Sequence, residues 1–319
     1  MRAVVCADSF KGTLASARVC AAIAAGLREA GWEADELPAA DGGEGTAAAL
    51  LAALGGRWVE APASDALGRP VDARFALLED GTAVVDAAEA VGLGRLRPDE
   101  LDPLVATSRG AGELIAAALG HTARVIVGAG GTATVDGGAG AVEVLPAAAR
   151  GRLRVACDVR TRWEDAARIF GPQKGADAQA VAELAARLDA LAGSLPRDPR
   201  GVPNTGCGGG LSGGLWAAFD AALEPGASLV LDLVGLDRRL EGAHLVVTGE
   251  GRLDEQTAEG KLVAEVAARA RRAGVPCAAV VGRDALGADA ASLGLERVVE
   301  AGDERSLAAA GRTLAAALC

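Results

Sequence analysis

Three lysines are the most unusual residues of this 319-residue chain. Lysine and arginine together number 32, yet lysine occurs only at Lys11, Lys174 and Lys261, each beside a glycine. Lysine carries a compact ammonium on a flexible stem, whereas arginine carries a planar fork. A site that transfers a phosphoryl group can need the compact charge where a glycine backbone lies close to the ligand. Because the chain has 44 glycines, the alternative is that one or two of these pairs arise by chance.

Glycine-rich segments that also contain acidic or hydroxyl residues occur five times. In open α/β sheets, ligands bind beyond the carboxyl ends of the strands. Glycines there allow backbone N–H groups to reach phosphate oxygens, and a following helix N-terminus adds partial positive charge. For any single segment, the alternative is a glycine that closes a turn. The segments are Asp8–Thr13, Asp41–Thr46, Gly128–Gly140, Thr205–Gly214 and Thr248–Asp254.

Carboxylates are the main candidates for general bases. The two histidines, His121 and His244, lie beside predicted helix ends or strand starts, which disfavours Ser-His-Asp chemistry. No G-x-x-x-x-G-K-[ST] pattern is present, so a P-loop is not expected. Five aspartates lie at predicted strand ends or in the glycine-rich segments, although about half of them would only cap helices or turns. They are Asp8, Asp41, Asp136, Asp158 and Asp254.

Composition and charge narrow the range of partners. The formal net charge is −11 and the pI is about 4.8, so the chain lacks the basic field that nucleic acid or an anionic membrane requires. Aromatic residues make up 3% of the chain, which disfavours stacking on single-stranded nucleic acid. The six cysteines show no C-x-x-C spacing, and no apolar run approaches the roughly 18 residues of a membrane span. We therefore expect a cytoplasmic protein without nucleic-acid or membrane partners, and we leave a homodimer open.

Strands and helices are predicted to alternate at both ends of the chain, which implies parallel βαβ units. In the middle, Val71–Leu78 and Ala83–Val85 flank Asp80-Gly81, a hairpin signal. We therefore predict an α/β fold with two α/β domains. Residues 1–62 and 240–319 would form a doubly wound parallel-sheet domain, and residues 63–239 would form a mixed α/β domain inserted into it.

The individual elements are predicted from apolar runs and periodicity. Further strands are expected at Arg2–Ala7, before Pro38, at Arg124–Val127 and Leu153–Cys157, near Leu229–Leu231, and at Leu245–Thr248, Cys277–Val281 and Arg297–Val299. Helices are expected at Thr13–Ala30, Gly45–Leu54, Gly112–Leu119, Ala178–Leu191, from the 206–214 loop to about Leu223, and at 261–273 and 304–318. Thr161 and Glu164 have the spacing of a capping box.

Six ordered blocks of the chain resemble the motifs of the bacterial (type I) glycerate kinase family. Asp8–Thr13 looks like the D-S-F-K-G-[ST] signature, and residues 41–46 resemble A-D-G-G-E-G-T. Residues 130–140 look like G-G-S-A-T-N-D-G-G-A-G, with Val135 in place of the asparagine. The remaining blocks are Ala156–Val159, Phe170–Ala176, and Thr248–Thr257 with Gly260-Lys261. The blocks span residues 8–261 and contain all three lysines.

The resemblance implies a flavodoxin- or Rossmann-like domain and a second α/β domain, with the site in the cleft between them. It implies phosphorylation of D-glycerate with ATP and Mg²⁺, for which we expect 2-phosphoglycerate ahead of 3-phosphoglycerate. Lys11 and Lys261 would neutralise phosphate or carboxylate. Asp41, Asp136 or Asp158 would orient the acceptor hydroxyl, and Asp136 and Asp158 would hold the metal. The other binding residues would be Asp8, Ser9, Gly42, Gly43, Glu44, Gly130, Gly131, Thr132, Lys174, Gly206, Gly208, Gly209, Gly249, Glu250, Gly251, Arg252 and Asp254.

The chain also departs from the family pattern. The span between Gly140 and Leu153 is compressed, and Arg160–Asp165 stands where an Asn-Pro and a glycine-containing loop are usual. Val135 lacks the amide donor and acceptor of the asparagine it replaces. Two alternatives follow: a kinase for another small hydroxy acid, and a ligand-binding paralogue without catalysis.

Overall fold

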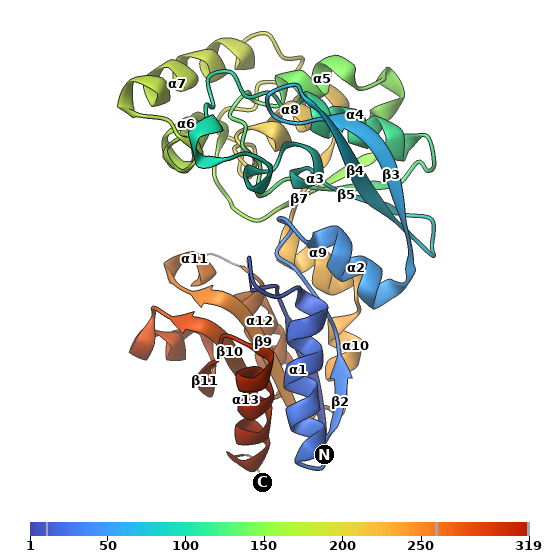
Figure 1. Cartoon of the computed structure of the whole chain (residues 1–319), viewed down its shortest axis with the longest axis vertical. Coiled ribbons are helices and arrows are strands. Elements are labelled where there is room, and N and C mark those ends of the chain that lie inside the picture. The colour runs from blue at the N-terminus through green and yellow to red at the C-terminus, as the bar shows by residue number, and fades with distance from the viewer. Residues whose placement is uncertain (11, 259–260, 318–319) are drawn as a thin grey trace. The chain divides into compact units, whose positions relative to one another are not determined.

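The computed structural model describes residues 1–10, 12–258 and 261–317 of the chain. The chain is divided into two compact units, and Figure 1 labels most of the elements of both. Unit 1 comprises Met1–Asp41, Ala48–Leu54 and Ala227–Cys319, and unit 2 comprises Gly42–Ala47 and Gly55–Gly226. Helices α2 (Thr46–Leu54) and α9 (Gly226–Leu233) each begin in unit 2 and continue in unit 1.

Unit 1 is built on a five-stranded sheet of order β11-β10-β9-β1-β2, in which every pair of neighbours is parallel. A parallel sheet needs helices on both faces, and its strands are therefore apolar on both sides. The central strands follow this rule, because Ala3–Ala7 and Leu245–Gly249 are fully buried. The strands are β1 (Arg2–Ala7), β2 (Glu33–Glu36), β9 (Leu245–Leu253), β10 (Cys277–Asp284) and β11 (Arg297–Glu300).

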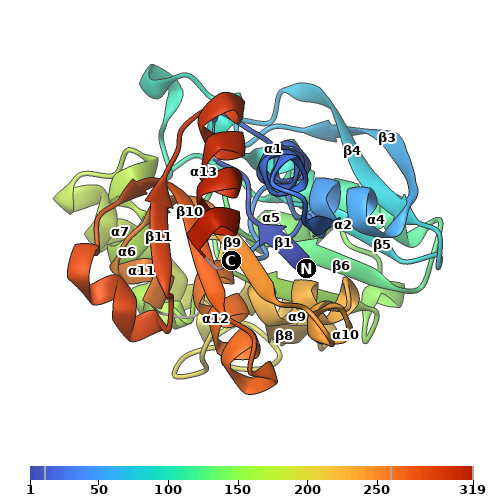
Figure 2. The ribbon, with the colours of Figure 1, turned by 90° about the horizontal axis from the view of Figure 1, so that it is seen from below.

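Helices cover both faces of this sheet. Helices α1 (Ser16–Glu29) and α13 (Glu304–Ala317) lie on one face, and α12 (Leu262–Ala273) and α10 (Leu236–Leu240) lie on the other (Figure 2). Residues Ala3, Val5 and Ala7 of β1 join the apolar cluster under α1 and α13, as the two-residue period of a strand requires. Unit 1 is thus doubly wound, as predicted.

Helices α1 and α13 approach each other at two glycines. A Cβ atom on Gly26 would lie 1.8 Å from the carbonyl oxygen of Ala308, and one on Gly311 would lie 2.3 Å from that of Ile23. Both distances are far below van der Waals contact, so these positions admit no side chain without movement of the backbone. The small residues of α1 and α13 therefore set how closely the two helices pack.

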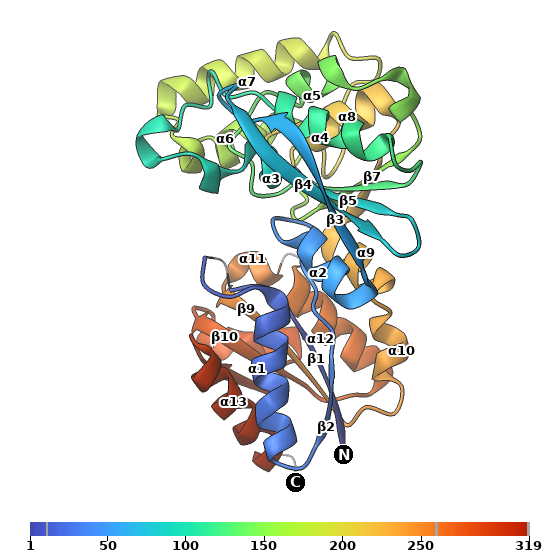
Figure 3. The same cartoon turned by 45° about the vertical axis from the view of Figure 1, so that its right-hand side comes forward.

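Unit 2 contains a six-stranded mixed sheet of order β3-β4-β5-β6-β7-β8. The β3–β4 and β4–β5 pairs are antiparallel and the remaining pairs are parallel. Figure 3 shows the long β3–β4 hairpin along one edge of the unit. The strands are β3 (Gly56–Ser64), β4 (Pro70–Leu78), β5 (Ala83–Asp86), β6 (Val125–Gly128), β7 (Leu153–Cys157) and β8 (Ala222–Pro225).

The helices of unit 2 pack in two apolar clusters. Helices α4 (Arg109–Leu119), α5 (Ala139–Val144) and α8 (Leu211–Phe219) share the larger cluster with the sheet, through side chains such as Phe75 and Leu114. Helices α6 (Ala166–Phe170) and α7 (Ala178–Ala192) form the second cluster around Trp163. The remaining short elements are α3 (Ala88–Val91), α11 (Glu255–Ala258) and the 3₁₀ turns Leu93–Arg95, Pro98–Glu100, Ala147–Ala149, Trp163–Asp165, Pro172–Lys174 and Gly287–Leu293.

The predicted α/β class, with one parallel and one mixed sheet, is confirmed, and so is the hairpin at Asp80-Gly81. Some local predictions are wrong. The run Leu229–Leu231 lies in helix α9, because a short apolar run fits a buried helix as well as a strand. The capping box at Thr161 does not form, because Arg162 precedes the 3₁₀ turn and the Glu164 carboxylate accepts the N–H of Gly201 instead.

Strands β3 and β8 were not predicted, and the helix expected to reach about Leu223 ends at Phe219, because Ala222–Pro225 pair with β7 as strand β8. Residues 56–64 do not alternate in polarity and include Pro62, which an edge strand such as β3 tolerates. Strand β3 pairs with β4 over its whole length, so residues 55–62 belong to unit 2 rather than to the first domain expected from the sequence. Residues 227–239 belong to unit 1. No helix in the described part of the chain combines the length and apolarity needed to cross a bilayer.

Substitution of Gly26 by alanine tests the close packing of α1 and α13. Alanine normally stabilises a helix interior by about 1 kcal/mol relative to glycine. Here the new methyl group meets the Ala308 carbonyl, so we expect Gly26→Ala to lower the free energy of unfolding by about 1–3 kcal/mol. Urea denaturation measures this change. Gly94→Ala is the control, because its Cβ would meet no atom within 4 Å, and it should change the free energy by less than about 0.5 kcal/mol.

Candidate active site

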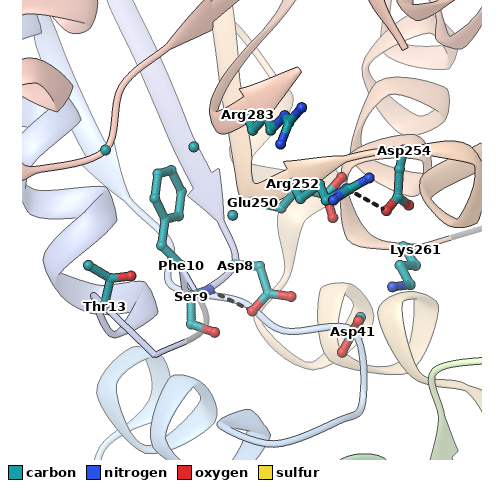
Figure 4. A pocket seen from close by; sticks show the side chains of 13 residues that line it. Asp8, Ser9, Phe10, Thr13, Asp41, Glu250, Arg252, Asp254, Lys261 and Arg283 are labelled. Atoms are coloured by element: carbon teal, nitrogen blue, oxygen red, sulfur yellow. Dashed lines mark hydrogen bonds and ion pairs between the residues drawn. The ribbon is translucent and has the colours of Figure 1, made fainter. Parts of the chain in front are cut away.

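A crevice of about 470 Å³ lies in unit 1, beyond the carboxyl ends of the parallel strands β1, β9, β10 and β11. This is where a doubly wound sheet places its ligands. Figure 4 shows charged side chains on one side of the crevice, and Phe10 and Thr13 on the other. Its lining comprises Asp8, Ser9, Phe10, Thr13, Asp41, Glu250, Gly251, Arg252, Asp254, Lys261, Gly282, Arg283 and Gly302.

Backbone hydrogen bonds place the two buried aspartates of the crevice. The N–H of Asp8 donates to the carbonyl of Gly249 at 2.8 Å, which continues the β1–β9 ladder by one residue. The N–H of Ala39 donates to the carbonyl of Ala7 at 3.2 Å and to the Ser16 hydroxyl at 3.0 Å. These bonds fix the segment that leads to Asp41 beside the end of β1. Asp8 and Asp41 are 5% and 4% exposed. Their positions are therefore fixed by the sheet rather than by a mobile surface loop.

Among the described residues, the crevice combines three cations with its carboxylates. Arg252 and Arg283 occupy matching positions of the neighbouring strands β9 and β10, and Arg252 forms an ion pair with Asp254 at 3.2 Å. Lys261 is the residue that precedes the first turn of α12. Its ammonium therefore adds to the partial positive charge of a helix N-terminus. Such a set of cations is suited to an anionic ligand such as a phosphate or a carboxylate.

Glu250 is a crevice carboxyl with a raised pKa. Burial raises its pKa to about 7, and the charges of Asp41 and Asp254 add to the rise. The hydroxyl of Thr257, which donates to Oε1 at 2.6 Å, and the ammonium of Lys261 act in the opposite direction. Glu250 therefore changes protonation state near neutral pH, unlike an exposed glutamate.

Three residues of the crevice lie outside the segments predicted from the sequence, namely Gly282, Arg283 and Gly302, whereas Phe10 and Thr13 lie in the predicted segment Asp8–Thr13 without being named as binding residues there. Gly282 and Gly302 follow the buried parts of β10 and β11, so the strand-end rule that selected the other segments would have found them. The backbone carbonyl of Gly251 lies 2.5 Å from where a Cβ on Gly282 would be, which explains the glycine. Arg283 carried no local signal, because its significance comes from its register with Arg252.

In unit 2, three predicted segments meet at the carboxyl ends of β5, β6 and β7. A Cβ on Gly130 would lie 2.8 Å from the Cα of Gly43 and 2.7 Å from a carboxylate oxygen of Asp158. A Cβ on Gly131 would lie 3.2 Å from the Cβ of Glu44. The glycines thus allow the 42–47 segment to pack directly against the loop after β6, with Asp158 beside it.

Lys174 is buried in unit 2 and holds the loop after β6. Its ammonium donates to the carbonyl of Thr134 at 2.7 Å and lies 3.4 Å from the hydroxyl of Thr132. Burial lowers its pKa to about 8, although Cys207, Asp136 and Asp158 favour the charged form. Lys174 therefore stabilises the conformation of this loop through direct hydrogen bonds.

Asp136 accepts hydrogen bonds from four donors within unit 2. One carboxylate oxygen accepts the N–H and the hydroxyl of Ser108, both at 2.8 Å, and the N–H of Gly140 at 3.2 Å. The other accepts the N–H of Gly138 at 3.1 Å. These contacts join the start of α4 to the start of α5, and they leave little capacity for a metal ion. The geometry thus favours a structural role for Asp136 over the metal role expected from the sequence.

The described residues contain no group of three or more His, Cys, Asp or Glu side chains that could hold a metal ion. Magnesium, however, is commonly bound by one or two carboxylates together with phosphates and waters. Asp158 fits that requirement, because it is partly exposed beside the glycine loop. The thiol of Cys207 donates to one of its oxygens at 3.0 Å.

The structure separates the predicted site residues into two groups. Asp8, Ser9, Asp41, Glu250, Gly251, Arg252, Asp254 and Lys261 line the crevice of unit 1. Gly42, Gly43, Glu44, Gly130, Gly131, Thr132, Asp136, Asp158, Lys174, Gly206, Gly208 and Gly209 belong to unit 2. Gly249 lies inside β9, where a Cβ would meet the Val280 carbonyl at 2.2 Å, and Lys11 lies outside the described residues.

Two predicted features of unit 2 have packing explanations. A Cβ on Gly206, Gly208 or Gly209 would lie 2.0–2.5 Å from a backbone carbonyl oxygen, so close approach alone requires these glycines. Val135 is buried in the apolar cluster around Trp163 and Leu188. Its substitution for asparagine therefore fills a core position.

Substitution of Glu250 by glutamine tests its raised pKa. Ionisation of Glu250 costs more in the folded state than in the unfolded state, so this cost is absent below about pH 4 and complete above about pH 7. Glutamine keeps the acceptor for Thr257 and removes the charge. At about pH 8 we expect Glu250→Gln to raise the free energy of unfolding by about 1–3 kcal/mol relative to its effect at low pH. Denaturation at several pH values measures this.

Glu100→Gln provides a control of opposite sign for that experiment. A hydrogen bond from Arg69 lowers the pKa of Glu100, so its charged form favours folding and its removal should not stabilise the protein at about pH 8. Equal effects of the two substitutions, or a pH-independent effect of Glu250→Gln, would contradict the assignment.

Comparison with known proteins identifies the family to which the chain belongs. The sequence model of the Glycerate kinase family matches residues 3–152 and 143–314. A glycerate kinase of Bacillus subtilis is 38% identical, over 88% of this chain and 85% of the relative, and a glycerate 2-kinase of Escherichia coli is 34% identical over the same shares. A solved structure of a Salmonella typhimurium LT2 protein assigned as glycerate kinase 2 covers 100% of this chain and 98% of its own, with a TM-score of 0.85 and 32% identity. The chain therefore belongs to the glycerate kinase family and is a kinase.

Proposed function

We propose that this kinase transfers the γ-phosphate of ATP to the 2-hydroxyl of D-glycerate in a magnesium-dependent reaction. The observation that carries the proposal is the unit 1 crevice, in which three cations and buried carboxylates lie at the strand ends of a chain from this family. The choice of the 2-hydroxyl is supported by the Escherichia coli relative, which is described as a glycerate 2-kinase.

In unit 1, Lys261, Arg252 and Arg283 would neutralise anionic oxygens of a substrate. Asp41 is the best placed carboxylate to orient an acceptor hydroxyl, because it is buried at the end of a rigid segment and lies on the crevice wall. In a loose phosphoryl-transfer transition state such a base mainly positions the nucleophile. Asp8 would support this arrangement from the neighbouring strand end.

In unit 2, Asp158 would hold the metal ion that accompanies the nucleotide. Magnesium neutralises the charge that develops on the transferred phosphoryl group. Lys174 would keep the 130–134 loop in place through its hydrogen bond to Thr134. Lys11 remains a predicted ligand of phosphate or carboxylate on the strength of its motif.

Turnover with D-glycerate and ATP-Mg²⁺, with NMR identification of the product, tests the proposal. We expect release of ADP and formation of 2-phosphoglycerate. Formation of 3-phosphoglycerate would overturn the regiochemistry, and faster turnover of another small hydroxy acid in a substrate panel would overturn the substrate. Calorimetric binding of both ligands without release of ADP would show a non-catalytic paralogue.

Substitutions of the crevice cations test their role. The loss of one hydrogen bond to a charged group costs about 1.5–3 kcal/mol, which corresponds to about ten- to hundredfold. We therefore expect Lys261→Ala and Arg283→Ala each to lower kcat/KM by about ten- to hundredfold. Steady-state kinetics for each substrate in turn would show which ligand each cation contacts.

Arg272→Ala is the matched control for the crevice cations. Arg272 lies on α12, its side chain is 64% exposed, and it is not part of the crevice lining. Its removal should leave kcat/KM unchanged. Comparable losses in all three variants would indicate a general electrostatic effect rather than contact with the ligand.

A further inference from the structure

Asp86 is a buried carboxylate of unit 2 that the sequence motifs did not include. It is the last residue of β5 and is 3% exposed. It accepts the N–H of Gly45 at 2.9 Å on Oδ2, and the N–H of Ala47 at 3.1 Å on Oδ1 and 3.2 Å on Oδ2. Helix α2 begins at Thr46, so these amides belong to the group that a helix N-terminus leaves without a partner in the helix itself. Asp86 thus caps α2 from 39 residues away in sequence.

The capped segment is the glycine-rich motif at residues 42–47. Within the segment, the Thr46 hydroxyl donates to the Gly43 carbonyl at 2.8 Å. Gly42 and Gly45 have φ values of 96° and 95°, which favour glycine. The segment has no strand ladder of its own, so its attachment to the sheet of unit 2 depends on contacts such as those to Asp86.

Asp86 lies at the centre of this attachment. Across the β5–β6 pair it faces Gly128, where a Cβ would lie 2.9 Å from Oδ1 of Asp86 and 3.1 Å from the Gly42 carbonyl oxygen. The carboxylate, the end of β6 and the glycine loop are therefore in direct contact. A shift of the carboxylate would move the loop relative to Gly130 and Gly131.

The electrostatics of Asp86 differ from those of another buried aspartate in the same unit. Burial raises the pKa of Asp86 to about 7, and the nearby charges of Glu89 and Glu44 add to the rise despite the two backbone hydrogen bonds. Asp65, which is 2% exposed, also accepts two backbone N–H groups, from Leu67 and Arg69. Its additional ion pair with Arg69 helps to lower its pKa. The charge of Asp65 thus favours folding, whereas the charge of Asp86 opposes it.

We propose that Asp86 is a positioning residue of the kinase reaction, whose carboxylate fixes the conformation of the 42–47 segment, a segment that the sequence motifs assign to ligand binding. A carboxylate whose charge opposes folding, placed where it orders a family motif, is explained by a role in the site rather than by stability. This inference rests on the proposed function for its kinetic readout only, because the order of the segment can be measured without turnover.

Asp86→Asn removes the charge and one of the two acceptor oxygens. At about pH 8 we expect a fall in kcat/KM of about ten- to hundredfold, because two charge-assisted hydrogen bonds are weakened, with the unfolding midpoint equal to or above that of the wild type. As the pH falls below about 6, Asp86 of the wild type becomes protonated and the ratio of wild-type to variant kcat/KM should approach one. The ratio cancels other titrating groups, including Glu250, because both proteins contain them.

Asp65→Asn is the matched control. It should lower the unfolding midpoint and leave kcat/KM of the folded enzyme unchanged. If Asp86→Asn keeps the kcat/KM of the wild type at about pH 8, or if both variants lose kcat/KM equally, the positioning role is overturned.

Hydrogen exchange of the backbone amides, followed by NMR, tests the same inference without catalysis. The amides of Gly45 and Ala47 should lose at least about tenfold in protection in Asp86→Asn and keep it in Asp65→Asn. Unchanged protection would overturn the proposal. If the wild type does not phosphorylate D-glycerate, the proposed function fails, and the exchange result still decides whether Asp86 orders the segment.

If Asp86→Asn does not fold, the protection of these amides in the wild type should fall between about pH 8 and pH 6, and a constant value would overturn the proposal.

Discussion

The rule that parallel strands end at the same edge of a sheet governs each unit of this molecule. In unit 1 it brings Asp8, Glu250, Arg283 and Gly302 to one edge, although they are separated by up to almost the whole length of the chain. In unit 2 the ends of β5, β6 and β7 lie in the same way beside the 42–47 segment. Backbone hydrogen bonds of the sheets fix these edges, so residues that directly follow the strands are brought to the same edge.

Glycine makes this convergence possible because the loops pack backbone against backbone. The approaches of Gly130 to Gly43, of Gly209 to Thr134 and of Gly282 to Gly251 leave no room for a Cβ atom. The same principle acts away from the site, at Gly26 between α1 and α13. The high glycine content of the chain is therefore only partly a matter of ligand contact, and several family-motif glycines are accounted for by close packing alone.

Four buried or partly buried carboxyl groups fall into two kinds with different physical consequences. Asp65 and Asp136 accept several hydrogen bonds and join neighbouring segments, and the charge of Asp65 favours folding. Asp86 is buried and Glu250 is partly buried, and in both the cost of desolvation outweighs the hydrogen bonds, so their pKa values rise to about 7 and their charges oppose folding. Glu250 lies in a family motif and Asp86 contacts the 42–47 motif, which is the pattern expected when stability is given up for the geometry or charge of a site.

The sequence by itself determined the α/β class, the central strands, the hairpin at Asp80-Gly81 and the membership in a kinase family, because short-range periodicity and contiguous motifs record these features. It also placed Asp8, Asp41, Glu250, Arg252 and Lys261 together, because all of them lie in motifs at strand ends or at a helix start. The tertiary structure alone decided that Arg283 lies beside Arg252, that Asp136 accepts hydrogen bonds from four donors and that Asp86 caps α2. These properties depend on register and burial between segments far apart in the chain. No local pattern of residues records register or burial. For the same reason the short apolar run Leu229–Leu231, which fits a strand as well as a buried helix, was predicted as a strand although it lies in α9.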